Sequence, residues 1–585
     1  MIVMINSLLY VSSFILLVTE ITLYPKKEKK AMLLTELSLA FITVLCYGVV
    51  VAQVYSVLEI AVNIQNISIS YIATSVLLGV ALLKKRKIQK LYFDRWQFFC
   101  VILFSIIFVL VELKTFSYEL RASFCNNIDP LVHLEMAMKI VRKQVLGRMP
   151  FAPFHNAMMI EIMSPLLPEH KYYKAFILAD SLHYYFELIF FYSLTLEISK
   201  RKVSKYLAPA ITLLYWLGYP LYSYVVGNFV YWSWGVILCG YVVYLVKQVI
   251  GSKGNWLHYL GIVLGIIGVL QCYMLFIPML MVGLLVMCYP IFHKQIVKNR
   301  KVLIGLGCGM LVFILLIMVA IYTYFGKSGM SGLFAALQLQ GGIYFNLGED
   351  FFLTLPIIMV YIVYKKEKKQ KDFYLLFLIG ISVCMVFILM LRSFDIISAY
   401  YFCKYFYVIW FFWWVVILQA IDEIDIKQEA RRYVKIYIML VAIAYISCFG
   451  RIGKLVKMPN EGVFCTTLYT NNLQCLDKNY EQYKYSSKKM KLFQDVKENL
   501  VDKGLQGVMV NCEGTNRKDE LWYRNITGEE SINYEQSEWK KFMEQDAKYD
   551  FYVIMKESEL YMDNADYFNQ YTIVFENEEG IVIQR

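Results

Sequence analysis

The chain has 585 residues, of which 59% are hydrophobic and only 18% are charged, and its formal net charge is +12. Soluble domains are about 45–50% apolar and about 25% charged, so this composition excludes an ordinary cytosolic enzyme and a disordered chain. Long apolar stretches recur between short polar breaks up to about residue 450. At about 20 residues for each spanning helix, this part of the chain predicts a polytopic α-helical membrane protein.

Basic residues gather in the polar breaks. The clusters lie at 25–30, 84–87, 200–202, 247–253, 293–301 and 365–371, with a weaker mixed cluster at 422–432. Short basic loops mark the cytoplasmic side of a membrane protein. If all seven breaks are cytoplasmic, an even number of spans separates each neighbouring pair. This arrangement accounts for the excess positive charge and gives no support to a nucleic-acid partner.

The apolar segments satisfy this rule with about fourteen spans and an external N-terminus. They cover residues 1–24, 31–54, 62–83, 95–116, 174–199, 206–224, 226–246, 256–271, 274–292, 302–325, 350–364, 373–391, 406–421 and 433–450. The first segment precedes its basic cluster, which favours an uncleaved helix over a signal peptide. The prediction leaves four sizeable segments outside: 117–173, 326–349, 392–405 and the chain after about residue 451.

The chain changes character after the transmembrane domain, which we place at 1–450. Residues 451–585 predict a soluble, extracytoplasmic α/β domain. Its expected helices lie near 487–502, 537–545 and 557–567, and its expected strands lie at 507–511, 551–555, 571–575 and 581–584. Asn525-Ile-Thr527 matches a glycosylation sequon, a pattern that is common by chance. Cys465 and Cys475 are able to form a disulfide in an oxidising compartment, but sequence alone does not decide this.

The external loop 117–173 predicts two amphipathic surface helices. The first is expected to begin with Asp129 as N-cap and Pro130 as the first helical residue. Leu131, Leu134 and Met138 then share one face, which favours a helix lying along the membrane surface. A break at 147–154 separates it from a second helix at about 156–167.

Asp129 is the candidate catalytic residue of this loop. A carboxylate directly after a span, on the external side, can act as general base towards an acceptor hydroxyl. The alternative is that Asp129 only caps the helix. His133 lies one helical turn later and could hold a phosphate or sugar oxygen, or pair with Asp129. Glu135 and His155 are further candidate substrate-binding residues.

A second candidate region, Arg392 to Lys404, lies between two late spans on the same face. Arg392, Tyr401 and Lys404 are its candidate substrate-binding residues, because cations at the membrane edge suit a lipid phosphate. The alternative is that the two cations reach the headgroups without any further role, as is common at the ends of spans.

Together these features resemble the GT-C superfamily of integral-membrane glycosyltransferases. The resemblance covers about residues 95–450 and also includes the external C-terminal domain. It rests on the acidic loop Ile128-Asp-Pro-Leu-Val-His133, on the break at Gly147, Pro150 and Pro153, and on Tyr400-Tyr-Phe-Cys-Lys-Tyr405. The chain departs from that family's pattern in having three spans before the one that leads to the loop. It also lacks a second acid next to Asp129.

The resemblance implies that Asp129 is the catalytic base or the acceptor-binding acid. It implies that Lys404, or Arg392 if the loop folds differently, lies near the phosphate of a polyprenyl-phosphate sugar donor. A glycine-rich nucleotide loop of either common type is absent from the sequence, which agrees with a lipid-linked donor. We expect transfer with inversion, without an obligatory metal or other cofactor, to an envelope glycan, lipid or protein acceptor at the outer face of the cell membrane.

Two other functions fit about fourteen spans. One is a transporter, such as a lipid-linked oligosaccharide flippase, although the sequence shows no two related halves, which mark many transporters, and an external α/β domain has no evident role in transport. The other is a non-catalytic membrane protein of envelope assembly. Sugar transfer by an Asp129→Asn variant separates these functions from a glycosyltransferase.

Overall fold

The computed structural model describes residues 2–25, 31–298, 351–424 and 485–584, with gaps at 86, 118–119, 148, 252–253, 352–353, 513–515, 535–538, 541–542 and 544–547, and with residues 331–332, 335 and 337–339. Most of this chain is helical, and a small sheet region lies near the C-terminus. Eight segments are long and apolar enough to cross a membrane: Val3–Leu23, Leu33–Val57, Ile64–Lys85, Arg95–Thr115, Val230–Ile250, Trp256–Ile291, Phe373–Ser393 and Ala399–Glu423. The chain therefore has the helices of a membrane protein.

Each predicted span within the described residues coincides with helical structure. The main helices are α1 (Ile2–Leu23), α2 (Leu33–Val57), α3 (Ile64–Lys85), α4 (Arg95–Thr115), α8 (Tyr172–Ile198), α9 (Lys202–Trp216), α11 (Val230–Ile250), α12 (Trp256–Tyr273), α13 (Ile277–Lys298), α17 (Leu355–Glu367), α18 (Phe373–Ser393) and α19 (Ala399–Glu423). Three of them, α8, α9 and α17, are not among the eight apolar segments. α9 and α17 are shorter than the length that a full crossing needs. The predicted spans 302–325 and 433–450 lie outside the described residues.

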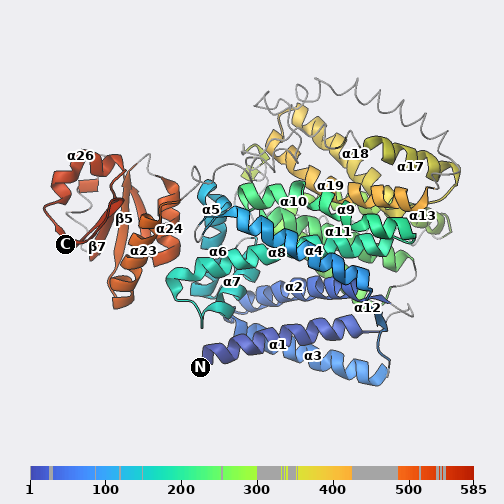
Figure 1. Ribbon diagram of the computed structural model, residues 1–585, viewed down its shortest axis with the longest axis horizontal. Coiled ribbons are helices and arrows are strands. Elements are labelled where there is room, and N and C mark those ends of the chain that lie inside the picture. The colour runs from blue at the N-terminus through green and yellow to red at the C-terminus, as the bar shows by residue number, and fades with distance from the viewer. Residues whose placement is uncertain are drawn as a thin grey trace.

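Where the structure describes them, most of the predicted cytoplasmic breaks lie at one end of the helical bundle. At the end of α1, Tyr24 accepts a hydrogen bond from Trp256 Nε1 at 2.7 Å, and the Lys85 ammonium lies 4.3 Å from its ring centre. Arg201 donates to the Glu423 carbonyl at 3.0 Å, and Lys365 forms an ion pair with the carboxylate of the same residue. α1 begins near the C-terminal domain and runs away from it (Figure 1), so this basic end is the far end of the bundle.

α19 lies at the centre of the bundle. Its sequence is apolar and aromatic on every side, as expected of a helix surrounded by others, and it is buried along almost its whole length. It packs against α8, α9, α11, α17 and α18. The Ser398 hydroxyl caps its first turn by accepting a hydrogen bond from the Tyr401 amide at 3.4 Å. The cap fixes where the helix begins, and the helix begins earlier than the predicted residue 406.

In the described residues the loop after α4 contains three α-helices, α5 (Ala122–Asn126), α6 (Asp129–Lys143) and α7 (Phe151–Met163). The predicted apolar face of α6 is buried at Leu131, Leu134 and Met138. The prediction for the second helix is wrong in two respects. α7 begins at Phe151 instead of about residue 156, and it is buried in the bundle against α1, α2 and α8 instead of lying on the surface. Pro153 does not prevent this start, because the first turn of a helix tolerates proline.

The C-terminal region folds around a five-stranded sheet. Its strands are β5 (Gly507–Cys512), β6 (Glu530–Tyr534), β7 (Phe551–Met555), β8 (Thr572–Glu576) and β9 (Gly580–Gln584), and its helices are α23 (Ser487–Asn499), α24 (Arg517–Thr527) and α26 (Glu559–Phe568). The strand order is β6-β5-β7-β9-β8, in which β5 pairs in parallel with β6 and β7 while β9 runs antiparallel to β7 and β8. The four predicted strands and two of the predicted helices are present. β6 and α24 were not predicted. Most of the predicted helix 537–545, together with Cys465 and Cys475, lies outside the described residues.

α24 attaches the C-terminal domain to α6 (Figure 1). Arg142 of α6 donates to the carbonyl oxygen of Asn525 at 3.1 Å, and the Asn525 side-chain amide donates to the carbonyl oxygen of Leu131 at 3.0 Å. The Trp522 ring lies 5.5 Å from that of Tyr173 and 6.4 Å from that of Phe124. The loop 117–173 and the C-terminal domain are therefore at the same end of the molecule, opposite the basic end.

Asn525, the asparagine of the sequon, is only 4% exposed. Its side-chain nitrogen donates the hydrogen bond to Leu131 just described. A glycan on this nitrogen would require both the hydrogen bond and the contact between α24 and α6 to break. The sequon therefore has a structural role in domain docking, and Asn525 is not a glycosylation site in this conformation.

Candidate functional site

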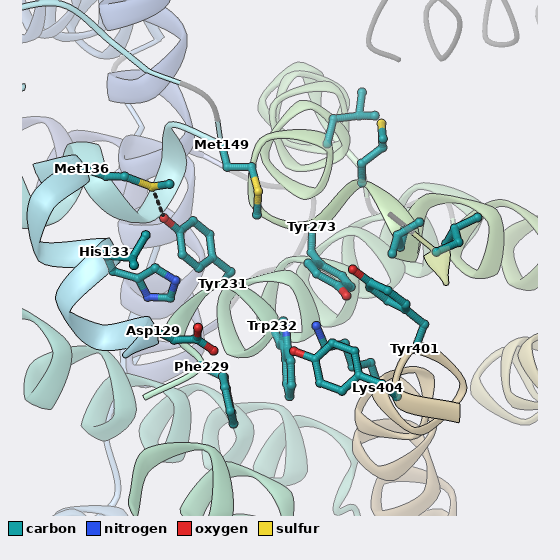
Figure 2. A pocket seen from close by; sticks show the side chains of 16 residues that line it. Asp129, His133, Met136, Met149, Phe229, Tyr231, Trp232, Tyr273, Tyr401 and Lys404 are labelled. Carbon is teal, nitrogen blue, oxygen red and sulfur yellow. Dashed lines mark hydrogen bonds between the residues drawn. The ribbon is translucent and has the colours of Figure 1, made fainter. Parts of the chain in front are cut away.

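A cavity of about 270 Å³ lies between the external loop and the bundle (Figure 2). Residues of α6, α11, α12, α19 and the turns beside them line it, and they are Asp129, Val132, His133, Met136, Met149, Phe229, Tyr231, Trp232, Leu270, Tyr273, Met274, Leu275, Leu337, Tyr400, Tyr401 and Lys404. Four residues from the two predicted regions, Asp129 and His133 from α6 and Tyr401 and Lys404 from α19, thus share one cavity. Regions of the chain that are far apart in sequence form it together.

Lys404 is a buried cation in an aromatic setting. Its side chain is only 5% exposed, and its ammonium lies 3.8 Å from the ring centre of Tyr400, 4.2 Å from that of Trp232 and 4.8 Å from that of Tyr401. Cation–π contacts of this kind contribute about 0.5–2 kcal/mol each. Within the described part of the chain, no ion pair or hydrogen bond joins this ammonium to a side chain.

The helical position of Lys404 corrects one expectation. The sequence suggested that Arg392 to Lys404 forms an external loop, but α18 extends to Ser393 and α19 begins at Ala399. Lys404 therefore projects from the second turn of a rigid helix into the cavity. A side chain on a helix inside the bundle is held more precisely than one on a loop.

Asp129 lies on the other side of the cavity, and its carboxylate points into it (Figure 2). The predicted capping role is wrong. α6 begins at Asp129 itself, the N-cap position belongs to Ile128, and the first amide of the helix, that of Asp129, donates to the side-chain oxygen of Asn127 at 3.2 Å. Burial raises the pKa of Asp129 above its usual range, while the positive charges of Lys404 and Arg517 act in the opposite direction. A half-buried carboxylate with a raised pKa is suited to accept a proton.

His133 is a neutral neighbour of Asp129. Burial, reinforced by the nearby charge of Lys404, lowers the pKa of His133 to about 3. Its Nδ1 atom is buried without a hydrogen-bond partner among the described residues, and its ring lies 4.2 Å from that of Tyr231 in an edge-on arrangement. The Tyr231 hydroxyl in turn donates to Met136 Sδ at 3.2 Å (Figure 2). At neutral pH His133 thus offers a hydrogen bond and no positive charge.

Three predicted site residues lie elsewhere. Glu135, on another face of α6, forms ion pairs with Lys139 at 3.1 Å and with Arg524 at 3.2 Å. Arg392 forms an ion pair with Asp395 at 2.9 Å and does not line the cavity. His155 lines a different cavity. The first two have structural contacts, and none of the three lines the cavity that contains Asp129.

The aromatic lining was not predicted from the sequence. Phe229, Tyr231 and Trp232 lie near the start of α11, inside a predicted span, where aromatic residues usually signal packing. The Gly227-Asn228 pair before them is a turn signal. Asn228 has a left-handed backbone with a φ of 52°, which asparagine tolerates better than most residues.

Buried charges hold this turn. The fully buried Arg121 donates to the side-chain oxygen of Asn228 at 3.0 Å and to the Ser181 hydroxyl at 2.7 Å. The Asn228 amide donates to Asp180, which also accepts a hydrogen bond from Asn156 at 2.9 Å. The side chain of Asn228 thus links a buried arginine to a buried aspartate. This network fixes the direction in which Phe229 enters the cavity.

No family model and no curated protein matches this chain. Within the described ranges, no three histidine, cysteine, aspartate or glutamate side chains gather in a way that could hold a metal ion.

Proposed function

We propose that the chain is a membrane glycosyltransferase that transfers a sugar from a polyprenyl-phosphate donor, with inversion, to a hydroxyl of an envelope glycan, lipid or protein. The observation that carries this proposal is that Asp129 and Lys404 line the same cavity. A candidate base and a candidate phosphate-binding cation are the two groups that this reaction needs. The resemblance to the GT-C superfamily assigns the same two roles to these residues.

Lys404 is the donor-binding residue of the proposal. A buried ammonium without a contacting anion is costly, because burial removes its hydration. A lipid phosphate in the cavity would place a negative charge in direct contact with the ammonium, whereas the Asp129 carboxylate lies on the other side of the cavity. The aromatic rings around Lys404 offer an apolar surface for the first isoprene units of the lipid. As the bond to the sugar breaks, the charge on the leaving phosphate grows, and Lys404 stabilises it.

Asp129 is the base. The acceptor hydroxyl gives its proton to the Asp129 carboxylate while its oxygen forms a bond to the anomeric carbon. The bond between that carbon and the phosphate oxygen breaks, and the electron pair leaves with the lipid phosphate. The neutral His133, one turn further along α6, donates or accepts a hydrogen bond with the sugar or the acceptor. A single direct displacement of this kind inverts the anomeric configuration.

The topology of the proposal has about fourteen spans and places the basic end in the cytoplasm. The loop 117–173 and the C-terminal domain then lie together outside the cell membrane. The contacts between α6 and α24 support a common side for these two segments. Cysteines introduced at Lys139 and Lys503 should react with an impermeant maleimide added outside intact cells, and a cysteine introduced at Lys366 should react only after permeabilisation. Labelling of positions 139 and 503 from opposite sides would contradict this topology.

The test of function uses the purified full chain in proteoliposomes with a panel of farnesyl-phosphate hexoses and pentoses. We expect at least one donor to lose its sugar to an acceptor in a membrane extract or to water. Lys404→Gln should raise the Kd for farnesyl phosphate at least tenfold, whereas the matched variant Lys366→Gln, at the basic end, should leave it unchanged. Movement of intact lipid-linked sugar across the bilayer without transfer would instead identify a flippase.

A further inference from the structure

A second cavity, of about 250 Å³, lies between α1, α2, α7, α8 and α11. None of its lining residues lines the first cavity. Most are apolar or aromatic, and the full set is Tyr10, Val11, Phe14, Phe41, Leu45, His155, Asn156, Met158, Met159, Ile162, Ala179, Leu182, His183, Phe186 and Trp234. The set contains no lysine, arginine, aspartate or glutamate, so the cavity does not suit a charged group.

Two histidines give this apolar cavity hydrogen-bonding capacity. His183 is only 4% exposed, and neither of its ring nitrogens has a hydrogen-bond partner in the part of the chain that the structure describes. The buried Nε2 atom of His155 is also without one. Buried polar side-chain atoms in proteins usually have partners, and leaving them without one is costly. Three imidazole nitrogens are therefore available to a ligand.

The two imidazoles are placed by one aromatic side chain. The His183 ring lies 4.2 Å and the His155 ring 6.3 Å from that of Trp234. The pKa of His155 is lowered to about 3 by burial, so its ring is neutral at physiological pH. A neutral imidazole presents one donor and one acceptor. The group that complements such an arrangement is an uncharged hydroxyl, which can also donate and accept.

The cavity also reaches the outer surface of the bundle. Val11 on α1 and Leu182 on α8 both line it, and they are 38% and 46% exposed. In a membrane protein, exposed apolar side chains on spanning helices face lipid. A ligand with an apolar chain can therefore reach the histidines from the bilayer without crossing water.

We propose that this cavity is a binding site for an uncharged lipid alcohol, with its chain among α1, α7 and α8 and its hydroxyl hydrogen-bonded to His155 and His183. The site is separate from the phosphate-binding cavity and does not depend on the proposed glycosyltransferase activity. A lipid phosphate is excluded by the lack of a cation in the lining, and a plain hydrocarbon leaves the histidines unsatisfied.

The test compares three probes that share one chain: farnesol, farnesene and farnesyl phosphate. Each is added to the detergent-purified full chain, and its Kd is measured through the fluorescence of the chain's tryptophans. We expect farnesol to bind more tightly than farnesene. Substitution His183→Phe keeps an aromatic ring of similar size and should weaken farnesol binding about 3–10-fold, to the level of farnesene. Lys404→Gln is the control, since it should weaken farnesyl phosphate binding and leave farnesol binding unchanged.

Cross-linking gives an independent readout. A photoreactive farnesol should label peptides of α1, α7 or α8 in the wild-type chain, and excess farnesol should suppress this labelling while farnesyl phosphate should not. Equal affinity of the wild-type chain for farnesol and farnesene would overturn the proposal. Unchanged farnesol affinity in the His183→Phe and His155→Phe variants, or labelling only of the cavity that contains Lys404, would overturn it as well.

Discussion

The ammonium of Lys404 lies 4.2 Å from the centre of the Trp232 ring, although the two side chains come from different helices, α19 and α11. The indole face attracts the cation and shields it from water at the same time. Neither effect neutralises the charge, and an anion entering the cavity would meet a cation already held in place. This contact links the buried aromatic residues of the bundle to the proposed chemistry.

Trp232→Leu should weaken donor binding without removing the cation. Loss of a cation–π contact worth about 0.5–2 kcal/mol should raise the Kd for farnesyl phosphate about 2–30-fold. Equilibrium binding of a labelled farnesyl phosphate measures this. Trp256→Leu, at the basic end, is the matched control and should leave the Kd unchanged. An unchanged affinity in Trp232→Leu would show that the indole does not support the phosphate site.

Asp129→Asn should not destabilise the protein at neutral pH. A lost helix cap would cost about 0.5–2 kcal/mol, but the Asp129 side chain makes no capping bond. Burial raises the pKa of Asp129, so between its unfolded and folded pKa values the folded protein binds more protons than the unfolded chain. Its unfolding free energy therefore falls as the pH rises through that range.

Asparagine does not titrate, so the unfolding free energy of Asp129→Asn does not fall in this way as the pH rises. Melting curves should show Asp129→Asn to be at least as stable as the wild-type chain at pH 7, and the difference should disappear below about pH 3.9, where the aspartate is protonated in both states. A lower melting temperature of the variant at pH 7 would instead support the structural role of Asp129 as a helix cap.

His133→Asn should lower the transfer rate less than Asp129→Asn does, and it should leave the pH profile unchanged. The pKa of His133 is lowered to about 3, so this side chain does not titrate between pH 5 and 8. The acid limb of kcat/KM instead reports Asp129, and it should lie above the usual aspartate pKa of about 3.9. A limb near pH 6.5 that His133→Asn abolishes would contradict this assignment.

Asn525→Ala should loosen the contact between the C-terminal domain and α6. The change leaves the Leu131 carbonyl oxygen without its Asn525 donor, at a cost of about 1–3 kcal/mol. Limited proteolysis should then cleave the variant faster at the boundary between the domains, whereas Asn569→Ala, at an exposed position, should behave as the wild-type chain. A glycan on Asn525 in the folded wild-type protein would rule out the docking contact.

The bundle was largely predictable from the sequence because apolar length and the positions of basic clusters carry strong physical constraints. In the described residues each predicted span lies on a helix, and most of the predicted cytoplasmic breaks meet at one end. Asp129, His133, Tyr401 and Lys404 were also identified from position and from the resemblance. What the sequence could not give was their shared cavity, since that depends on how α6 and α19 pack in three dimensions.

Other features were missed for identifiable reasons. α24 is short and polar on one face. Its Asn525-Ile-Thr527 pattern matches a sequon, but its apolar face, with Trp522, decides its packing. The burial of α7 was not predicted, because the helices that cover it in the bundle come from other parts of the sequence. Glu135 lies near Asp129 in sequence, but a helix directs these two side chains to different faces.

If Asp129 and Lys404 act together in one catalytic cavity, Asp129→Asn should separate donor binding from sugar transfer when the transfer rate is measured at saturating donor. We expect the purified variant to bind farnesyl phosphate with an affinity near that of the wild-type chain, while its sugar-transfer rate falls about 10²–10⁴-fold, as for the loss of a general base. A variant that bound the donor and transferred sugar at close to the wild-type rate would show that Asp129 is not the catalytic base.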